Sequence, residues 1–165
     1  MTTVSVVIGA YNHRDLTEQI LKDIAATADL DYEVVVVDDG STDRTAEELL
    51  RWHGFIDKRV VVVHHTENRG VSCAWNSGID AASGEFVIVL NNDLRITDPH
   101  WMSKTVAVLG QHCVVGVLLR DANLLTVYRG KPVPYLEGWY LAAKRNDFLE
   151  IGMFDEDFAP YLFED

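Results

Sequence analysis

The sequence of 165 residues is poor in cysteine and has no long apolar run. Its two cysteines, Cys73 and Cys113, lack the spacing of a metal-binding or redox motif, so we expect reduced thiols in a cytoplasmic protein. The first residues lack the basic region of a signal peptide. No apolar segment approaches the ~20 residues that span a bilayer. The sequence therefore predicts a cytoplasmic protein with no transmembrane segment.

Positive charge is also scarce in this sequence. Lys and Arg total 14 against 26 Asp and Glu, which gives a formal net charge of −12. Because affinity for nucleic-acid backbones comes from Lys and Arg, we expect no nucleic-acid polymer as a partner. A single nucleotide is not excluded, since a bridging cation can join its phosphates to protein carboxylates.

Glycine-rich phosphate loops are missing as well. The first apolar run, "VSVVIGA", continues as "GAYNHRD", with one glycine where a dinucleotide-binding turn has three. The Gly-Lys-Ser/Thr sequence of a Walker loop does not occur. An acidic pair follows the second apolar run, but the Gly-Ser-Thr after it does not fit a phosphorylation-receiver domain. Phosphates would therefore have to be held mostly by a metal ion.

What the sequence does contain is a regular alternation of β-branched runs and segments with helical periodicity. This alternation predicts an α/β fold, with a mostly parallel sheet covered by helices on both faces. Right-handed crossovers place the carboxyl ends of such strands at one edge, where ligands bind. The expected strands are "VSVVIGA" (4–10), "YEVVVVDD" (32–39), "RVVVVHH" (59–65), "EFVIVL" (85–90) and "CVVGVLL" (113–119).

Polar residues gather at this predicted edge. Asp38 and Asp39 end the second strand, and Asn91, Asn92 and Asp93 follow the fourth. Each cluster by itself could be a turn, because Asp and Asn side chains hydrogen-bond to local backbone. Their convergence on one edge favours a binding site, and their oxygen atoms suit Mg²⁺ or Mn²⁺.

Four stretches together cover nearly the whole chain: "VSVVIGAYNHRDLTEQIL", "EVVVVDDGSTDRT", "NRGVSCAWNSGIDAASGEFVIVLNNDL" and "LAAKRNDFLEIGMFDEDFAPYLFED". In this order they resemble stretches of family 2 glycosyltransferases, which have the GT-A fold, a mostly parallel, Rossmann-like sheet. The resemblance implies one domain, with a nucleotide-sugar-binding half at about 1–98 and an acceptor-side half at about 99–165.

The resemblance also implies an activity. We expect metal-dependent transfer of a sugar from a UDP-, GDP- or dTDP-sugar, with inversion at the anomeric carbon. The expected cofactor is Mn²⁺ or Mg²⁺. The expected acceptor is a hydroxyl group, such as that of a glycan, a lipid-linked glycan or a protein.

Roles for the nucleotide-binding residues follow from the same resemblance. Ala10 and Tyr11 match the segment that lines the base pocket; Tyr11 could instead be a packed turn aromatic. Asp39 matches the carboxylate that contacts the base, and Asp38 would orient the loop or the ribose. Arg69 would reach the base or the phosphates, unless it is a solvated loop charge.

The predicted metal and catalytic residues lie in two further motifs. Asn91-Asn92-Asp93 occupies the place of the family's Asp-x-Asp motif, with asparagine replacing the first acid. We expect Asp93 to bind the metal, Asn91 to be a second metal ligand, and Asn91 and Asn92 to contact the nucleotide-sugar. Asp165 is the predicted catalytic base, with Glu164 as a second candidate or partner; apart from the resemblance, the pair would read as a solvated acidic tail.

Two alternatives remain open at this point. The family usually continues past the Glu-Asp pair, so we expect an incomplete acceptor half, and the chain could be a donor-binding module without activity of its own. A nucleotidyltransferase that forms nucleotide-sugars should carry a glycine-rich, basic loop after the first strand.

We read 121–138 as a hairpin or mobile loop, Trp139 and Tyr140 mainly as core residues, and His64 and His65 as loop and packing residues.

Overall fold

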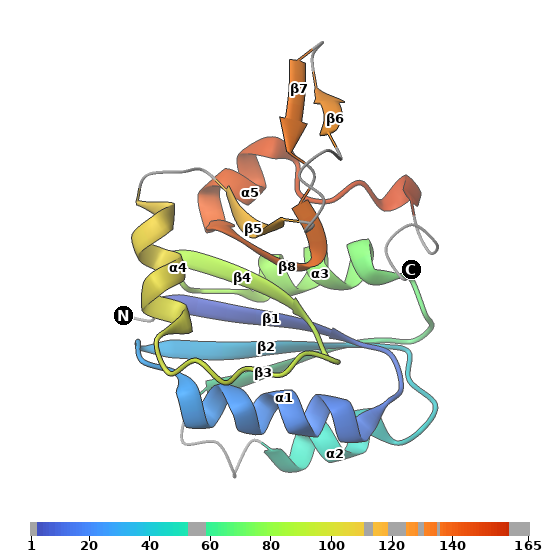
Figure 1. Cartoon of the computed structure of the whole chain (residues 1–165). Helices are drawn as coiled ribbons and strands as arrows, with labels where there is room; N and C mark the ends of the chain where they lie inside the picture. Colours follow the sequence, from blue (N-terminus) through green and yellow to red (C-terminus); the bar gives the residue numbers. More distant parts are fainter. Residues whose placement is uncertain are drawn as a thin grey trace.

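The computed structural model describes residues 3–52, 59–110, 114–118, 125–128, 131–134 and 136–158. Its main feature is a six-stranded sheet in the order β3-β2-β1-β4-β8-β5 (Figure 1). The strands of this sheet are β1 (Val4–Ala10), β2 (Tyr32–Asp39), β3 (Arg59–His65), β4 (Phe86–Asn91), β5 (Val114–Leu118) and β8 (Leu136–Lys144). The helices are α1 (Arg14–Thr27), α2 (Thr45–Trp52), α3 (Val71–Ala81), α4 (Trp101–Leu109), α5 (Arg145–Ile151) and the 3-10 turn η1 (Glu156–Phe158).

The four strands β1 to β4 are parallel, which confirms the predicted mostly parallel α/β sheet. The strand β8 pairs antiparallel with β4 on one side and with β5 on the other. The sequence analysis did not predict β8, and it read Trp139 and Tyr140 of this strand mainly as core residues. The chain reverses before β8 through a hairpin of β6 (Leu125–Tyr128) and β7 (Lys131–Pro134), which confirms the hairpin reading of this region.

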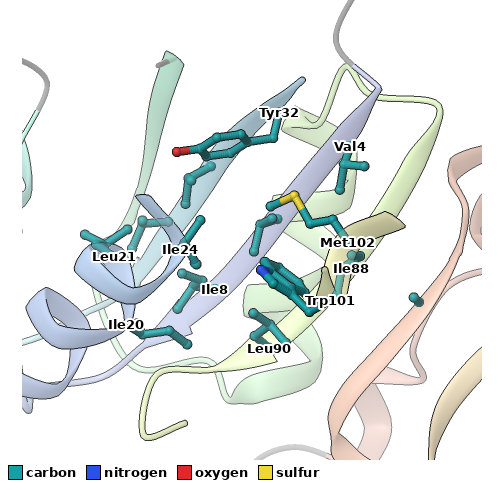
Figure 2. Packing of buried hydrophobic residues seen from close by; sticks show 14 of the residues in the cluster. Val4, Ile8, Ile20, Leu21, Ile24, Tyr32, Ile88, Leu90, Trp101 and Met102 are labelled. Carbon is teal, nitrogen blue, oxygen red and sulfur yellow. The ribbon is translucent and has the colours of Figure 1, made fainter. Parts of the chain in front are cut away.

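Both faces of the sheet are covered, so its central strands are apolar without alternation. On one face, β1 and β4 pack against α1 and α4, as Figure 2 shows for Ile8, Ile24 and Trp101. On the other face, Val7 of β1 packs with Trp75 of α3 and with residues of α5. This double burial explains why the strands read as continuous Val and Ile runs.

The second half of β8 shows the same two-sided packing. Ala142 belongs to the cluster on the α1 face, and Ala143 belongs to the cluster on the α3 face. Tyr140 packs edge-on against Trp101 and hydrogen-bonds to Thr105 through its hydroxyl. Burial raises the pKa of the Tyr140 phenol. Tyr140 is thus a core residue, as the sequence analysis preferred.

The helix α3 lies unusually close to the sheet at Gly78. A methyl group added there would overlap the Cγ1 atom of Val7 and lie 3.2 Å from Cγ2 of Val37. Both valines belong to the central strands and are fully buried. The absence of a side chain at Gly78 therefore sets the distance between α3 and the strands that end at the functional edge.

The chain beyond β4 is fastened to α1. The Asn92 amide donates to the Thr17 hydroxyl at 3.0 Å. The Asp23 carboxylate accepts from Arg95 Nε at 2.7 Å and from the Ile96 N–H at 3.2 Å. The hydrogen bond from Arg95, followed by those from Ile96 and Gln19, lowers the pKa of Asp23. These contacts fix the path of the turn that contains Asp93.

Within the described part of the chain, no helix combines the length and the apolar character needed to cross a membrane.

We expect Gly78→Ala to lower the free energy of unfolding in urea by up to about 2 kcal/mol. The clash with Val7 opposes and outweighs the gain in helix propensity of about 1 kcal/mol, since overpacking costs about 1–3 kcal/mol. The matched control is Gly110→Ala at the end of α4, where the new methyl would meet its nearest atom at 3.4 Å. A Gly78→Ala protein as stable as the control would contradict the close packing.

The Asp23 contacts predict a specific dependence of stability on pH. Because the pKa of Asp23 is lowered in the folded state, its contribution is fully present above its unfolded pKa of about 4 and is lost as the pH falls through the folded pKa. We therefore expect the stability difference between wild type and Asp23→Asn to be constant from about pH 7 to 5 and to shrink below about pH 4. The exposed Asp80→Asn serves as the charge control; an unchanged difference at low pH would refute the role of Asp23.

Candidate functional site

The carboxyl edge of the sheet brings the two predicted acidic clusters to the same place. In the strand register, Ala10 of β1 lies beside Asp38 of β2, and Gly9 of β1 lies beside Asn91 of β4. The chain order reverses direction at β1, with β2 and β3 on one side and β4 on the other. Such a switch point is where open α/β sheets bind ligands. The β2 and β4 chains there are two strand spacings apart, roughly 10 Å.

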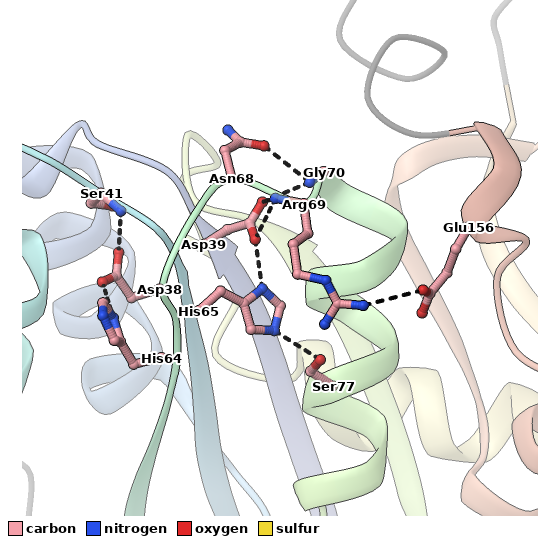
Figure 3. Close-up of polar contacts among 10 residues, drawn as sticks. All are labelled: Asp38, Asp39, Ser41, His64, His65, Asn68, Arg69, Gly70, Ser77 and Glu156. Carbon is pink, nitrogen blue, oxygen red and sulfur yellow. Dashed lines mark hydrogen bonds and ion pairs between the residues drawn. The ribbon is translucent and has the colours of Figure 1, made fainter.

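Asp39 is a buried carboxylate that accepts hydrogen bonds from three donors (Figure 3). The Arg69 N–H reaches both of its oxygens, at 3.0 and 3.1 Å, and the Gly70 N–H reaches Oδ2 at 2.8 Å. His65 Nδ1 lies 2.6 Å from Oδ1. Gly70, with φ of 89°, is the N-cap of α3, so the carboxylate also lies at the positive end of that helix.

His65 connects Asp39 to the middle of α3. Its Nε2 lies 2.9 Å from the Ser77 hydroxyl, so both ring nitrogens are engaged and His65 has none left for a metal. The sequence analysis read His64 and His65 as loop and packing residues; both end β3, and both also pair with the acids of β2. The Ser77–His65–Asp39 order is that of a hydrolase triad, but Ser77 lies inside a helix whose neighbouring N–H groups are engaged, so no oxyanion hole forms.

Asp38 organises the loop that follows β2. It is completely buried, and its carboxylate accepts from the Ser41 N–H at 3.2 Å and pairs with His64 Nδ1 at 2.8 Å. The Ser41 hydroxyl accepts the N–H of Asn12, and the Asn12 side chain accepts the N–H of Thr42. Asp38 therefore acts on the loop, as one of its two predicted roles proposed.

The same contacts hold the β1–α1 loop in a strained shape. Asn12 and His13 have φ of 58° and 54°, in the left-handed region that non-glycine residues rarely adopt. Tyr11, just before them, is 44% exposed, so its alternative role as a packed turn aromatic is not favoured. Ala10 is buried and can offer a ligand mainly its backbone.

The three polar residues at the end of β4, Asn91, Asn92 and Asp93, differ in their surroundings. Asn92 is held by Thr17, whereas Asp93 is exposed and makes no hydrogen bond to any other described residue. Across the described ranges, no group of three or more His, Cys, Asp or Glu side chains could hold a metal by itself. Asp93 and Asn91 fit a cation that takes most of its ligands from phosphates and water, as Mg²⁺ commonly does.

Arg69 connects this edge to the segment that contains η1. Its guanidinium is about half exposed and lies 3.5 Å from Glu156 of η1. Glu156 also accepts from the Asn76 amide at 2.9 Å, and this hydrogen bond is the main cause that lowers its pKa. Asn76 further donates to the Phe154 carbonyl and accepts the Phe154 N–H. The segment around Phe154 is thus fixed to α3.

Sequence reasoning missed four residues of this network: His65, Ser77, Asn76 and Glu156. His65 had a usable signal, because the pairs Asp38-Asp39 and His64-His65 end neighbouring parallel strands in register. Asn76 and Glu156 had none, since 80 residues separate them. The predicted catalytic residues Glu164 and Asp165 lie outside the described residues.

Comparison with known proteins identifies relatives of the chain. The family model for glycosyl transferase family 2 matches residues 5–165. A protein of Edwardsiella ictaluri named undecaprenyl-phosphate 4-deoxy-4-formamido-L-arabinose transferase is 38% identical over 122 residues, which are 72% of this chain and 37% of the relative. The dolichol-phosphate mannosyltransferase of Pyrococcus furiosus is 39% identical over 93 residues, which are 56% of this chain and 26% of the relative.

Solved structures agree with this result. A mannosyltransferase from Pyrobaculum calidifontis, in complex with GDP-Man and Mn²⁺, gives a TM-score of 0.80 at 28% identity over 93% of this chain and 48% of its own. TarS from S. aureus, in complex with UDP, gives 0.73 at 20% identity over 94% of this chain and 51% of its own, and supports the GT-A fold alone. The chain spans about a third of the length of the curated relatives. Because the family model matches nearly the whole length of this chain, the chain belongs to glycosyl transferase family 2.

Proposed function

We propose that this chain binds a nucleotide-diphosphate-sugar at the carboxyl edge of its sheet and transfers the sugar to an acceptor with inversion. The observation that carries the proposal is the placement of Asp39 and the Asp93 turn on the two strands that flank β1 at the switch point. Family membership supports it, and so does the solved relative whose complex contains GDP-Man and Mn²⁺.

The donor half, at about 1–98, would hold the nucleotide. The exposed ring of Tyr11 can stack on the base, next to the backbone of Ala10. Asp39 offers its carboxylate to base N–H groups, and the exposed guanidinium of Arg69 can exchange Glu156 for the base or a phosphate. That exchange is easy, because exposed ion pairs contribute only about 0–1 kcal/mol.

Asp93 and Asn91 would hold a divalent cation, Mn²⁺ or Mg²⁺, together with the diphosphate. When bound, such a cation neutralises the charge that grows on the leaving diphosphate. Asn91 carries no charge, so the exposed carboxylate of Asp93 is the main protein contribution. Asn92 acts through Thr17, which keeps the turn in place, and a direct contact of Asn92 with the donor is not needed.

The acceptor half, at about 99–165, would supply the base. In an inverting displacement the acceptor oxygen bonds to the anomeric carbon as the bond to the diphosphate oxygen breaks on the opposite face. A hydroxyl acceptor must lose its proton, and Asp165, with Glu164 as partner, would take it. The contacts of Asn76 and Glu156 fix the segment that leads to these residues in the sequence.

The chemistry of the acceptor decides how much the base matters. Two relatives are named for undecaprenyl phosphate and dolichol phosphate, which suggests a polyprenyl phosphate beside the hydroxyl acceptors of glycans, lipid-linked glycans and proteins. A phosphate monoester is largely ionised at neutral pH, so its oxygen attacks without a base.

A nucleotidyltransferase is not favoured, since Asn12 and His13 stand where its glycine-rich loop would be.

We expect UDP-, GDP- or dTDP-sugars to raise the melting temperature only with Mn²⁺ or Mg²⁺, and Asp93→Ala to abolish the metal-dependent part. A ligand of the folded state adds about 1.4 kcal/mol of stability per tenfold increase in concentration once saturating. The matched control is Asp80→Ala, an exposed carboxylate at the far end of α3. An Asp93→Ala protein with the full metal-dependent shift would refute the proposed metal contact.

We expect Asp165→Asn to reduce transfer to hydroxyl acceptors by about 10²–10⁴-fold and transfer to a polyprenyl phosphate far less. Product formation is measured with each acceptor class at fixed donor and Mn²⁺, with Asp157→Asn as the control. An equal loss for both classes would contradict the role of Asp165 as a base. Metal-dependent donor binding without any transfer by the wild type would instead favour a donor-binding module.

A further inference from the structure

We propose that His65, supported by Ser77, is a positioning residue for base recognition: it fixes the Asp39 carboxylate so that the site prefers bases with a ring N–H. Uracil, thymine and guanine have such an N–H on the edge that faces a partner base, and cytosine and adenine have a bare ring nitrogen there. The inference rests on the proposed function, because it assumes that Asp39 meets the base of the donor.

The contacts of His65 fix Nδ1 as the hydrogen-bond donor of the ring. A carboxylate has only acceptors, so the short contact between His65 Nδ1 and Asp39 Oδ1, at 2.6 Å, requires the proton on Nδ1. In the neutral ring Nε2 then has no proton, and it accepts from the Ser77 hydroxyl at 2.9 Å. His65 and Asp39 are 8% and 3% exposed, so water competes little for these bonds.

The remaining capacity of Asp39 allows one more donor. Its two oxygens offer about four acceptor positions. Three donors, namely His65 Nδ1 and the N–H groups of Arg69 and Gly70, already occupy most of them. A carboxylate held in this way can accept a ring N–H, but it repels a ring nitrogen that carries a lone pair. Discrimination against cytosine and adenine follows from that repulsion.

The neighbouring pair of Asp38 and His64 differs in the feature that matters. Its histidine side chain is 53% exposed, and among the described residues only Asp38 hydrogen-bonds to it. The carboxylate of Asp38 acts on the N–H of Ser41 within the loop. Figure 3 shows His65 between Asp39 and Ser77 of α3. With both ring nitrogens engaged, His65 can hold the carboxylate of Asp39 in one orientation.

The test compares the affinities of UDP, GDP, CDP and ADP, with Mn²⁺, for the wild type and for His65 variants by calorimetry. We expect His65→Leu to weaken UDP or GDP binding by about tenfold, with CDP and ADP little changed, so that the selectivity narrows. His65→Asn keeps an N–H donor near the Nδ1 position and should restore much of the selectivity. His100→Leu, an exposed histidine before α4, is the control.

A second measurement does not depend on any nucleotide. Ring ¹⁵N shifts of the wild type should show His65 protonated at Nδ1, and Ser77→Ala should change the Nε2 signal while the fold is kept. If His65→Leu does not fold, Ser77→Ala carries the selectivity test, because it removes the partner of His65 Nε2 and should also narrow the selectivity. A proton on Nε2 alone, or wild-type selectivity in both His65→Leu and Ser77→Ala, would overturn the inference. Failure of the wild type to bind any nucleotide would overturn the proposed function itself.

Discussion

The structure of the functional edge depends on the buried carboxylate of Asp39. Three polar groups from two other elements converge on it: a ring N–H from the end of β3 and two backbone N–H groups at the start of α3. Burying a carboxylate without such partners would cost much free energy. Moving any of the three donors away from Asp39 is therefore unfavourable, and this holds them in place. One side chain thereby sets the positions of strand β3, helix α3 and the intervening loop with Arg69.

The acids at this edge fall into two groups with different surroundings. Asp38 and Asp39 are buried and hydrogen-bonded, whereas Asp93 is exposed and makes no hydrogen bond within the described residues. An exposed carboxylate with no protein partner remains available to a cation or a phosphate-bound metal, whereas the buried carboxylates already use most of their acceptor positions on protein donors. The sequence shows three similar acids, and only the contacts distinguish the organising ones from the available one.

The parallel part of the fold could be predicted because each strand carries its own signal, a Val and Ile run bounded by turn residues. The placement of Asp38 and Asp93 at one edge followed from topology alone. The antiparallel strand β8 could not be predicted, since "GWYLAAK" mixes aromatics and alanines, whose preferences depend on what packs against them. The contact between Asn76 and Glu156 was also beyond prediction, because it arises only when residues far apart in the chain are brought together by folding.

The position of β8 has a consequence for how the two proposed functional halves relate. This strand lies in the proposed acceptor half, yet it pairs with β4 of the proposed donor half, residue for residue from Phe86 to Leu90. A fragment that ended near residue 98 would leave the edge of β4 unpaired and its apolar surface exposed, which invites aggregation. The proposed donor and acceptor halves therefore share one sheet, and a cut at that point would remove a strand that covers the edge of β4.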